Sequence, residues 1–130
     1  MLSEVAPRGG LELSVALVGE TEIRDLNRRY LGKDEATDVL SFPQMSPGEL
    51  ARPARGGPSE PEPLGDIAIC LPVASRQASR RGSTVMDEVL VLAAHGLLHL
   101  VGYDDGSEEG AVEMEAAEKR LVGRSIKDSC

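Results

Sequence analysis

The feature that most constrains the fold is an apolar run over residues 84–101, which holds both histidines of the chain. Thr84, a residue typical of helix N-caps, opens the run, and Asp87 and Glu88 follow in the expected first turn. Beyond them, apolar side chains occupy nearly the whole circumference of a helix, and such a helix is stable only when other parts of the protein surround it. We therefore predict a buried central helix on which the rest of the chain packs.

The other elements are predicted from the spacing of their apolar residues, which repeats every two positions in strands and every 3.6 in helices. We expect strands over residues 11–20, 37–43 and 64–72, and helices over 21–32, 73–81 and 107–123. Thr21 and Ser107 suit the N-caps of the first and last helices, and Gly32 suits the end of the first. This order predicts an α+β fold in which helices pack on a single mixed sheet of three to four strands.

Proline is concentrated between the second and third predicted strands. Six of the eight prolines lie in residues 43–63, together with several glycines and charged residues. Such a composition buries too little apolar surface to fold by itself. We expect a long flexible loop over residues 43–64, within one domain that spans residues 1–130.

Charge and composition limit the partners that the chain can bind. The formal net charge is −8 and aromatic residues make up 2% of the sequence. Both values argue against a surface that holds nucleic acid by bulk electrostatic attraction or by stacking of bases. DNA is therefore not expected as a partner, and RNA would have to be bound through a local basic patch.

The sequence predicts a cytoplasmic protein without a membrane partner. Its start lacks the pattern of a secretory signal, and its longest apolar run, residues 89–100, is too short to cross a bilayer. Cys70 and Cys130 are too few and too differently placed to indicate a disulfide framework, which favours a reducing compartment.

The two histidines have the spacing of metal ligands. His95 and His99 lie four residues apart, so a helix presents both imidazoles on one face. Such pairs are often only packed or exposed, but a buried ring nitrogen without a partner costs about 1–3 kcal/mol, and a shared cation satisfies both rings. Gly102 can reverse the chain and bring Asp104 or Asp105 toward the histidines. Two imidazoles and one carboxylate, with a fourth position left for water, form a known catalytic zinc arrangement.

These residues belong to a longer pattern. HGLLHLVGYDD, residues 95–105, closely resembles the signature HGxLHLxGYDH of the YbeY family of bacterial metal-dependent endoribonucleases. ELSVALVGETEIRDLNRRYLGKDEATDVLSFP is similar to the strand, helix and strand of that family, GDIAIC to its next strand, and EEGAVEMEAAE to its acidic helix after the signature. The resemblance runs in order from about Glu12 to Glu118. It implies a fourth strand and a zincin-like central helix that carries the histidine pair.

The resemblance also implies a function and a set of site residues. His95, His99 and Asp105 match the three metal ligands of the signature and are expected to form the catalytic site, with one Zn²⁺ per chain or another divalent ion in its place. Asp104 is expected to hydrogen-bond the turn or a histidine ring. The implied activity is that of an endoribonuclease in maturation of the small-subunit ribosomal RNA 3′ end and in ribosome quality control. Ribosomal RNA and the small ribosomal subunit are the implied partners.

The chain departs from the family pattern at three places. Asp105 replaces the third histidine, and its negative charge would lower the Lewis acidity of the ion. Leu31 replaces an arginine that is expected to bind phosphate, so Arg28, Arg29 or Lys33 would have to bind the substrate in its place. The family also begins with a further strand and helix, for which the opening residues leave no room.

Two alternative functions remain at this point. The Leu31 and Asp105 departures favour a non-catalytic, ribosome-associated module in which the ion only stabilises the fold. The spacing HxxxHxxGxxD is also similar to that of zinc peptidases, which place a glutamate after the first histidine as the general base. Gly96 stands at that position and has no side chain, so the peptidase is the less favoured of the two.

Overall fold

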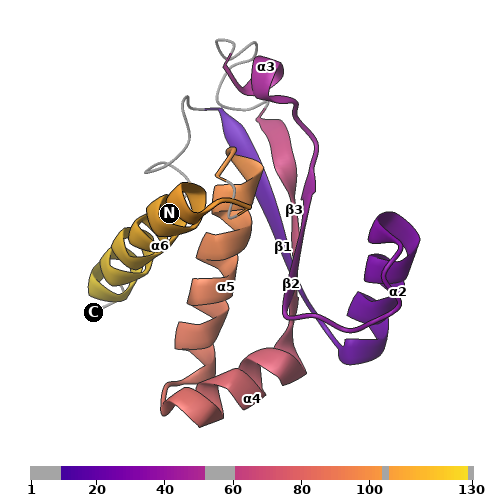
Figure 1. Cartoon of the computed structure of the whole chain (residues 1–130), viewed down its shortest axis with the longest axis vertical. Helices are drawn as coiled ribbons and strands as arrows, with labels where there is room; N and C mark the ends of the chain where they lie inside the picture. Colours follow the sequence, from indigo (N-terminus) through magenta and orange to yellow (C-terminus); the bar gives the residue numbers. More distant parts are fainter. Residues whose placement is uncertain (1–9, 52–60, 104–105, 129–130) are drawn as a thin grey trace.

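The computed structural model describes residues 10–51, 61–103 and 106–128. Within them, three strands and five helices follow one another along the chain (Figure 1). Their bounds are β1 Leu11–Val18, α2 Glu20–Leu31, β2 Val39–Pro43, α3 Pro47–Leu50, β3 Glu62–Cys70, α4 Leu71–Arg81, α5 Val85–Leu100 and α6 Glu108–Asp128. The strand order is β1-β3-β2, with β1 parallel and β2 antiparallel to β3. The predicted α+β class and mixed sheet are confirmed; the described residues contain no fourth strand.

Helices cover both faces of this sheet (Figure 1). On one face α5 lies against β2 and β3, and α6 packs against α5. On the opposite face Ile23 of α2 packs with Leu40 of β2 and Cys70 of β3. Because successive side chains of a strand point to opposite faces, each strand contributes to both layers.

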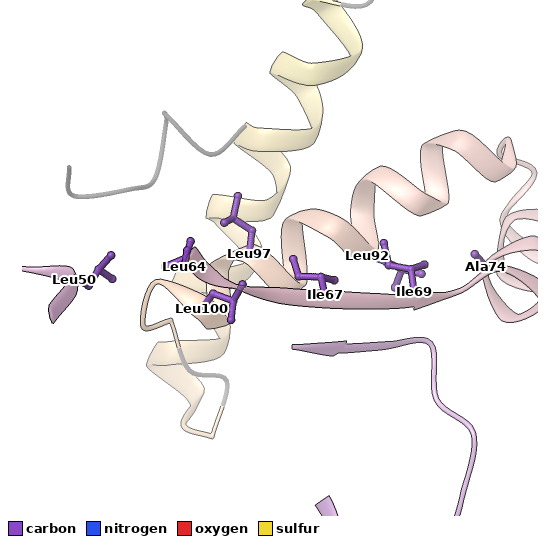
Figure 2. Packing of buried hydrophobic residues seen from close by; sticks show 8 residues of the cluster. All are labelled: Leu50, Leu64, Ile67, Ile69, Ala74, Leu92, Leu97 and Leu100. Atoms are coloured by element: carbon purple, nitrogen blue, oxygen red, sulfur yellow. The ribbon is translucent and has the colours of Figure 1, made fainter. Parts of the chain in front are cut away.

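The main core lies between the sheet and α5. Ile67 and Ile69 of β3 belong to one hydrophobic cluster with side chains of α5, among them Leu92 and Leu97 (Figure 2). All four are 5% exposed or less. Complete burial of one such side chain contributes about 1.5–3 kcal/mol, so this layer fixes the position of α5.

The start of α5 is held by polar contacts as well. The Thr84 hydroxyl accepts a hydrogen bond from the Asp87 amide at 3.1 Å, which confirms the predicted N-cap. Glu88, 2% exposed, pairs with Arg81 at the end of α4 with 3.2 Å between the charged atoms. A buried carboxylate without such a partner would be strongly destabilising, so the pair sets how α4 and α5 meet.

Several predicted boundaries were wrong. Helix α2 begins at Glu20 with Gly19 as its N-cap, so Thr21 lies inside the helix and does not cap it. Strand β3 begins at Glu62, before the expected end of the loop, because Glu62 and Pro63 extend the parallel pairing with β1. The short helix α3 also lies in the segment expected as a loop. The centre of that segment, residues 52–60, is outside the described residues.

For the last helix, α6, the predicted start is confirmed and the predicted end is wrong. The Ser107 hydroxyl accepts a hydrogen bond from the Gly110 amide at 3.0 Å, as expected of an N-cap. The helix continues to Asp128, beyond the predicted end at residue 123. In the part of the chain that the structure describes, no single helix is long and apolar enough to cross a membrane; α4 and α5 pass that test only as a pair, bent by 114° at their junction.

Candidate functional site

The two histidines converge near the C-terminal end of α5. The Nε2 atoms of His95 and His99 lie 3.1 Å apart. Their rings meet edge to face, with centroids 4.7 Å apart and planes inclined by 79°. The predicted pair therefore directs two ring nitrogens toward one point. The side chain of His95 is 33% exposed, so this point is accessible from solvent.

This geometry fits a shared divalent ion. Zinc lies about 2.0–2.1 Å from each imidazole nitrogen in tetrahedral sites, which places two ligand nitrogens about 3.3 Å apart. The 3.1 Å separation observed here is close to that value. The donor set also suits zinc, because imidazole nitrogen is among its usual ligands.

The third predicted ligand is Asp105, which follows α5. Asp105, and Asp104 with its predicted orienting role, lie outside the described residues. Among residues 10–51, 61–103 and 106–128, no group of three histidine, cysteine or acidic side chains is arranged to hold a metal. The described part of the candidate site is thus the histidine pair, and its role in metal binding and the third ligand stay predictions.

A carboxylate on α6 contacts the histidine pair. Glu118 Oε1 hydrogen-bonds His95 Nδ1, the ring nitrogen that faces away from His99. The Glu118 side chain is 21% exposed, whereas Glu115 on the same helix is 66% exposed and pairs with Lys119. Glu118 was not among the site residues predicted from the sequence.

The sequence does carry a signal for Glu118. The buried side chains of α6 include Met114, Ala117 and Leu121, which pack against Ala94 and other residues of α5. Residue 118 follows Met114 by four and precedes Leu121 by three, so it belongs to the same helical face. A glutamate within an apolar face requires a polar partner, and the partner here is His95.

Gly96 is positioned away from the histidine site. A Cβ atom at Gly96 would lie 2.9 Å from Ser41 Oγ and 3.0 Å from Ile67 Cγ2. In addition, the Ser41 hydroxyl donates to the Gly96 carbonyl at 3.0 Å. The position after the first histidine therefore faces the sheet at close contact, where a glutamate side chain does not fit. This geometry argues against the catalytic arrangement of zinc peptidases.

The basic residues of α2 are not brought to the histidines. Arg28 and Arg29 both pair with Asp25, at 2.6 Å and 2.9 Å, on the helix that covers the opposite face of the sheet (Figure 1). Their charges are thus partly compensated on their own helix. Lys33 follows this helix and is exposed, and Leu31 at its last position is 54% exposed.

A third arginine of α2 is also paired. Arg24 donates hydrogen bonds to Asp34 at 2.8 Å and 3.3 Å. This contact lowers the pKa of the Asp34 carboxyl and raises that of the Arg24 guanidinium. The basic side of α2 is therefore largely a set of local ion pairs, and the substrate-binding role of Arg28, Arg29 and Lys33 stays a prediction.

Comparisons with known proteins agree with the signature. A family model described as Endoribonuclease YbeY matches residues 1–125. The chain is 45% identical to the Endoribonuclease YbeY of Thermus thermophilus over 114 residues, which cover 88% of this chain and 76% of the relative. It is 45% identical to the protein of that name from Thermobifida fusca over 120 residues, with 90% and 76% of the two chains covered.

The fold has a solved counterpart. The solution structure of a Thermotoga maritima protein matches with a TM-score of 0.58 and 26% identity, covering 98% of this chain and 77% of that one. The family model and the relatives both extend across the histidine signature and the strands and helices around it. The chain therefore belongs to the YbeY family of endoribonucleases.

Proposed function

We propose that this chain is a metal-dependent endoribonuclease that acts on ribosomal RNA at the 3′ end of the small-subunit RNA, in ribosome maturation and quality control. The observation that supports metal dependence is the distance of 3.1 Å between the Nε2 atoms of His95 and His99. Membership of an endoribonuclease family supports RNA as the substrate. The small-subunit RNA and the small ribosomal subunit are proposed from the resemblance of residues 95–105 to the family signature. The cytoplasm is the proposed compartment, and the buried free thiol of Cys70 is consistent with it.

In this proposal His95 and His99 hold one divalent ion, with Asp105 as the third ligand. A zinc ion held by these residues would supply Lewis acidity toward the oxygen atoms of a phosphodiester. The protein holds the two rings at a fixed separation, since both extend from one buried helix. Their position near the molecular surface leaves access for an RNA strand, as the partial exposure of His95 allows.

Charge restricts how RNA reaches this site. Glu108, Glu109 and Glu113 are exposed in the first turns of α6. Glu109 and Glu113 also line a hollow beside Tyr103, just after the end of α5. Carboxylates there repel phosphate, so the proposed RNA path avoids this hollow and approaches the histidines from another direction.

The test of the proposal is cleavage of an RNA that spans the 3′ end of the small-subunit ribosomal RNA. We expect cleavage by the purified zinc-loaded protein, its loss on chelation, and its return when Zn²⁺ or Mn²⁺ is added. A casein digest run beside it is expected to show no cleavage, because Gly96 stands where zinc peptidases carry their general base and has no side chain. The ends of the RNA product identify the nucleophile, since a 2′,3′-cyclic phosphate requires attack by the internal 2′-hydroxyl.

Asp105 as the third ligand makes a separate prediction. Asp105→Ala is expected to lower the metal content of the purified protein from about one ion per chain to well below half, because two imidazoles alone leave the site short of the three protein ligands of catalytic zinc centres. Asp104→Ala is the matched control and is expected to retain most of the metal. Atomic absorption on both variants gives the answer; loss of metal from the Asp104 variant alone would exchange the two roles.

The Leu31 and Asp105 departures favour one competing function, a non-catalytic module that binds the ribosome. It predicts a different result in the same assays. The protein would bind stoichiometric metal and the small ribosomal subunit, yet single-turnover RNA cleavage would be absent with every divalent ion tried. That combination overturns the proposed activity and leaves the metal site intact.

A further inference from the structure

We infer that Glu118 is a positioning residue that fixes the proton of His95 on Nδ1 and leaves Nε2 free to bind a metal ion. This inference rests on the proposed metal site. Its basis is the contact between Glu118 Oε1 and His95 Nδ1, seen together with the 3.1 Å approach of the two Nε2 atoms. The HGxLHLxGYDH signature ends before α6, and Glu118 is the last residue of the segment that resembles the acidic helix of the family.

The hydrogen-bonding capacities of the three groups assign the protons. An ionised carboxylate can only accept, so the nitrogen that contacts Glu118 must donate, and a neutral imidazole with Nδ1–H has its lone pair on Nε2. His95 Nε2 is then an acceptor, and the donor to it at 3.1 Å is His99 Nε2. In the metal-free protein the two rings thus carry their protons on different nitrogens, and only His99 must change tautomer to become a ligand.

The packing of α6 places this carboxylate. Met114, Ala117 and Leu121 pack with Ala94 and Leu98 of α5, which stand on either side of His95 in the sequence. Figure 1 shows the two helices side by side. Glu118 therefore reaches His95 from a helix that packs on α5, and its low exposure strengthens the hydrogen bond relative to one in water.

Glu118 is a partner of the ligand and not a ligand itself. Nδ1 and Nε2 lie on different sides of the imidazole ring, and Glu118 contacts Nδ1 while His99 approaches Nε2. A carboxylate that stays on Nδ1 cannot reach an ion bound between the two Nε2 atoms. Carboxylates that accept from the second nitrogen of a ligating histidine fix its tautomer and raise its basicity.

The first test measures the tautomers directly in the metal-free protein. Long-range ¹H–¹⁵N spectra at about pH 8.5, where an ordinary imidazole is neutral, separate protonated from unprotonated ring nitrogens. We expect the Nδ1–H form for His95 and the Nε2–H form for His99 in the wild type. Glu118→Ala is expected to give a mixture at His95, whereas Glu115→Ala leaves the wild-type pattern. An Nε2–H form of His95 in the wild type would overturn the inference.

The second test measures zinc affinity by competition with a chromophoric chelator. Loss of such an orienting partner typically weakens metal binding about 10–100-fold, and we expect this loss for Glu118→Ala and none for Glu115→Ala. Glu118→Asp, which keeps the charge on a shorter side chain, is expected to recover part of the affinity. If Glu118→Ala binds zinc as tightly as the wild type, the inference is wrong.

The two tests distinguish this inference from the proposed function. Should the wild type bind zinc and fail to cleave RNA, the tautomers and affinities above still decide the role of Glu118. Should Glu118→Ala unfold, circular dichroism will show it, and Glu118→Gln then keeps the size of the side chain without its charge. The amide can donate to Nδ1 as well as accept from it, so we expect a mixed tautomer and weaker zinc binding in that variant.

Discussion

His99→Ala is expected to lose stoichiometric zinc and RNA cleavage together while the protein stays folded. Loss of an orienting partner alone costs about 10–100-fold in affinity, so removal of a ligand should cost more than about 100-fold. His99 is only partly buried, and the hydrogen bond of its ring within the described residues is to His95. Little of the core therefore depends on it. Metal analysis, RNA cleavage and circular dichroism on one sample check the three parts of this result.

Comparison of His95→Ala with His99→Ala separates the effect of losing a metal ligand from the effect on stability of the fold. His95→Ala removes the same number of ligands, but it also leaves Glu118 without its partner at 21% exposure. An unpaired, largely buried acceptor costs about 1–3 kcal/mol, so the His95 variant should melt at a lower temperature than the His99 variant. Equal metal content in the wild type and both variants would contradict the site. Val112→Ala, a substitution of an exposed side chain on α6, serves as the control for handling and purity.

Sequence predicts the elements of this fold well where the signal is local. The N-caps Thr84 and Ser107 were predicted from a suitable side chain beside the first turn. The same signal was wrong at Thr21, because α2 begins earlier, at Glu20. The i,i+4 spacing of the two histidines was equally local. The convergence of their Nε2 atoms follows from the helix they share.

The sequence does not specify which part of a sheet a helix covers. The alternation in β1 predicts a half-buried strand, and Leu11 and Leu13 do pack at the edge of the core. Val15 and Leu17, in the same alternation, are 47% and 55% exposed, because α5 lies over β2 and β3 and not over β1. Burial of an edge strand depends on tertiary arrangement, which periodicity within the strand does not encode.

The same limit applies to the site. Glu118 lies 23 residues from His95 and meets it only through the packing of two helices. Arg28 and Arg29 were predicted as substrate-binding residues with no position relative to the histidines. Their helix, α2, packs on the face of the sheet opposite to α5. Long-range contacts of this kind come from the three-dimensional arrangement and not from any single segment.

Gly65→Ala is expected to lower the free energy of unfolding by about 3 kcal/mol, or the melting temperature by about 10 °C, the upper end of the usual overpacking range. The added Cβ would lie 2.6 Å from the Phe42 carbonyl oxygen and 2.8 Å from Leu100 Cδ2. The carbonyl belongs to β2, which pairs with β3 at this point, so it cannot move without loss of the pairing. Gly48→Ala is the matched control, because its nearest neighbour is 3.9 Å away, and its melting temperature should stay within about 2 °C of the wild type. Leu100 directly follows His99 on α5, so displacement of the Leu100 side chain should also weaken zinc binding in the Gly65→Ala variant. Thermal melts and zinc competition measure both effects. If Gly65→Ala matches Gly48→Ala in both measurements, the prediction from this packing is wrong.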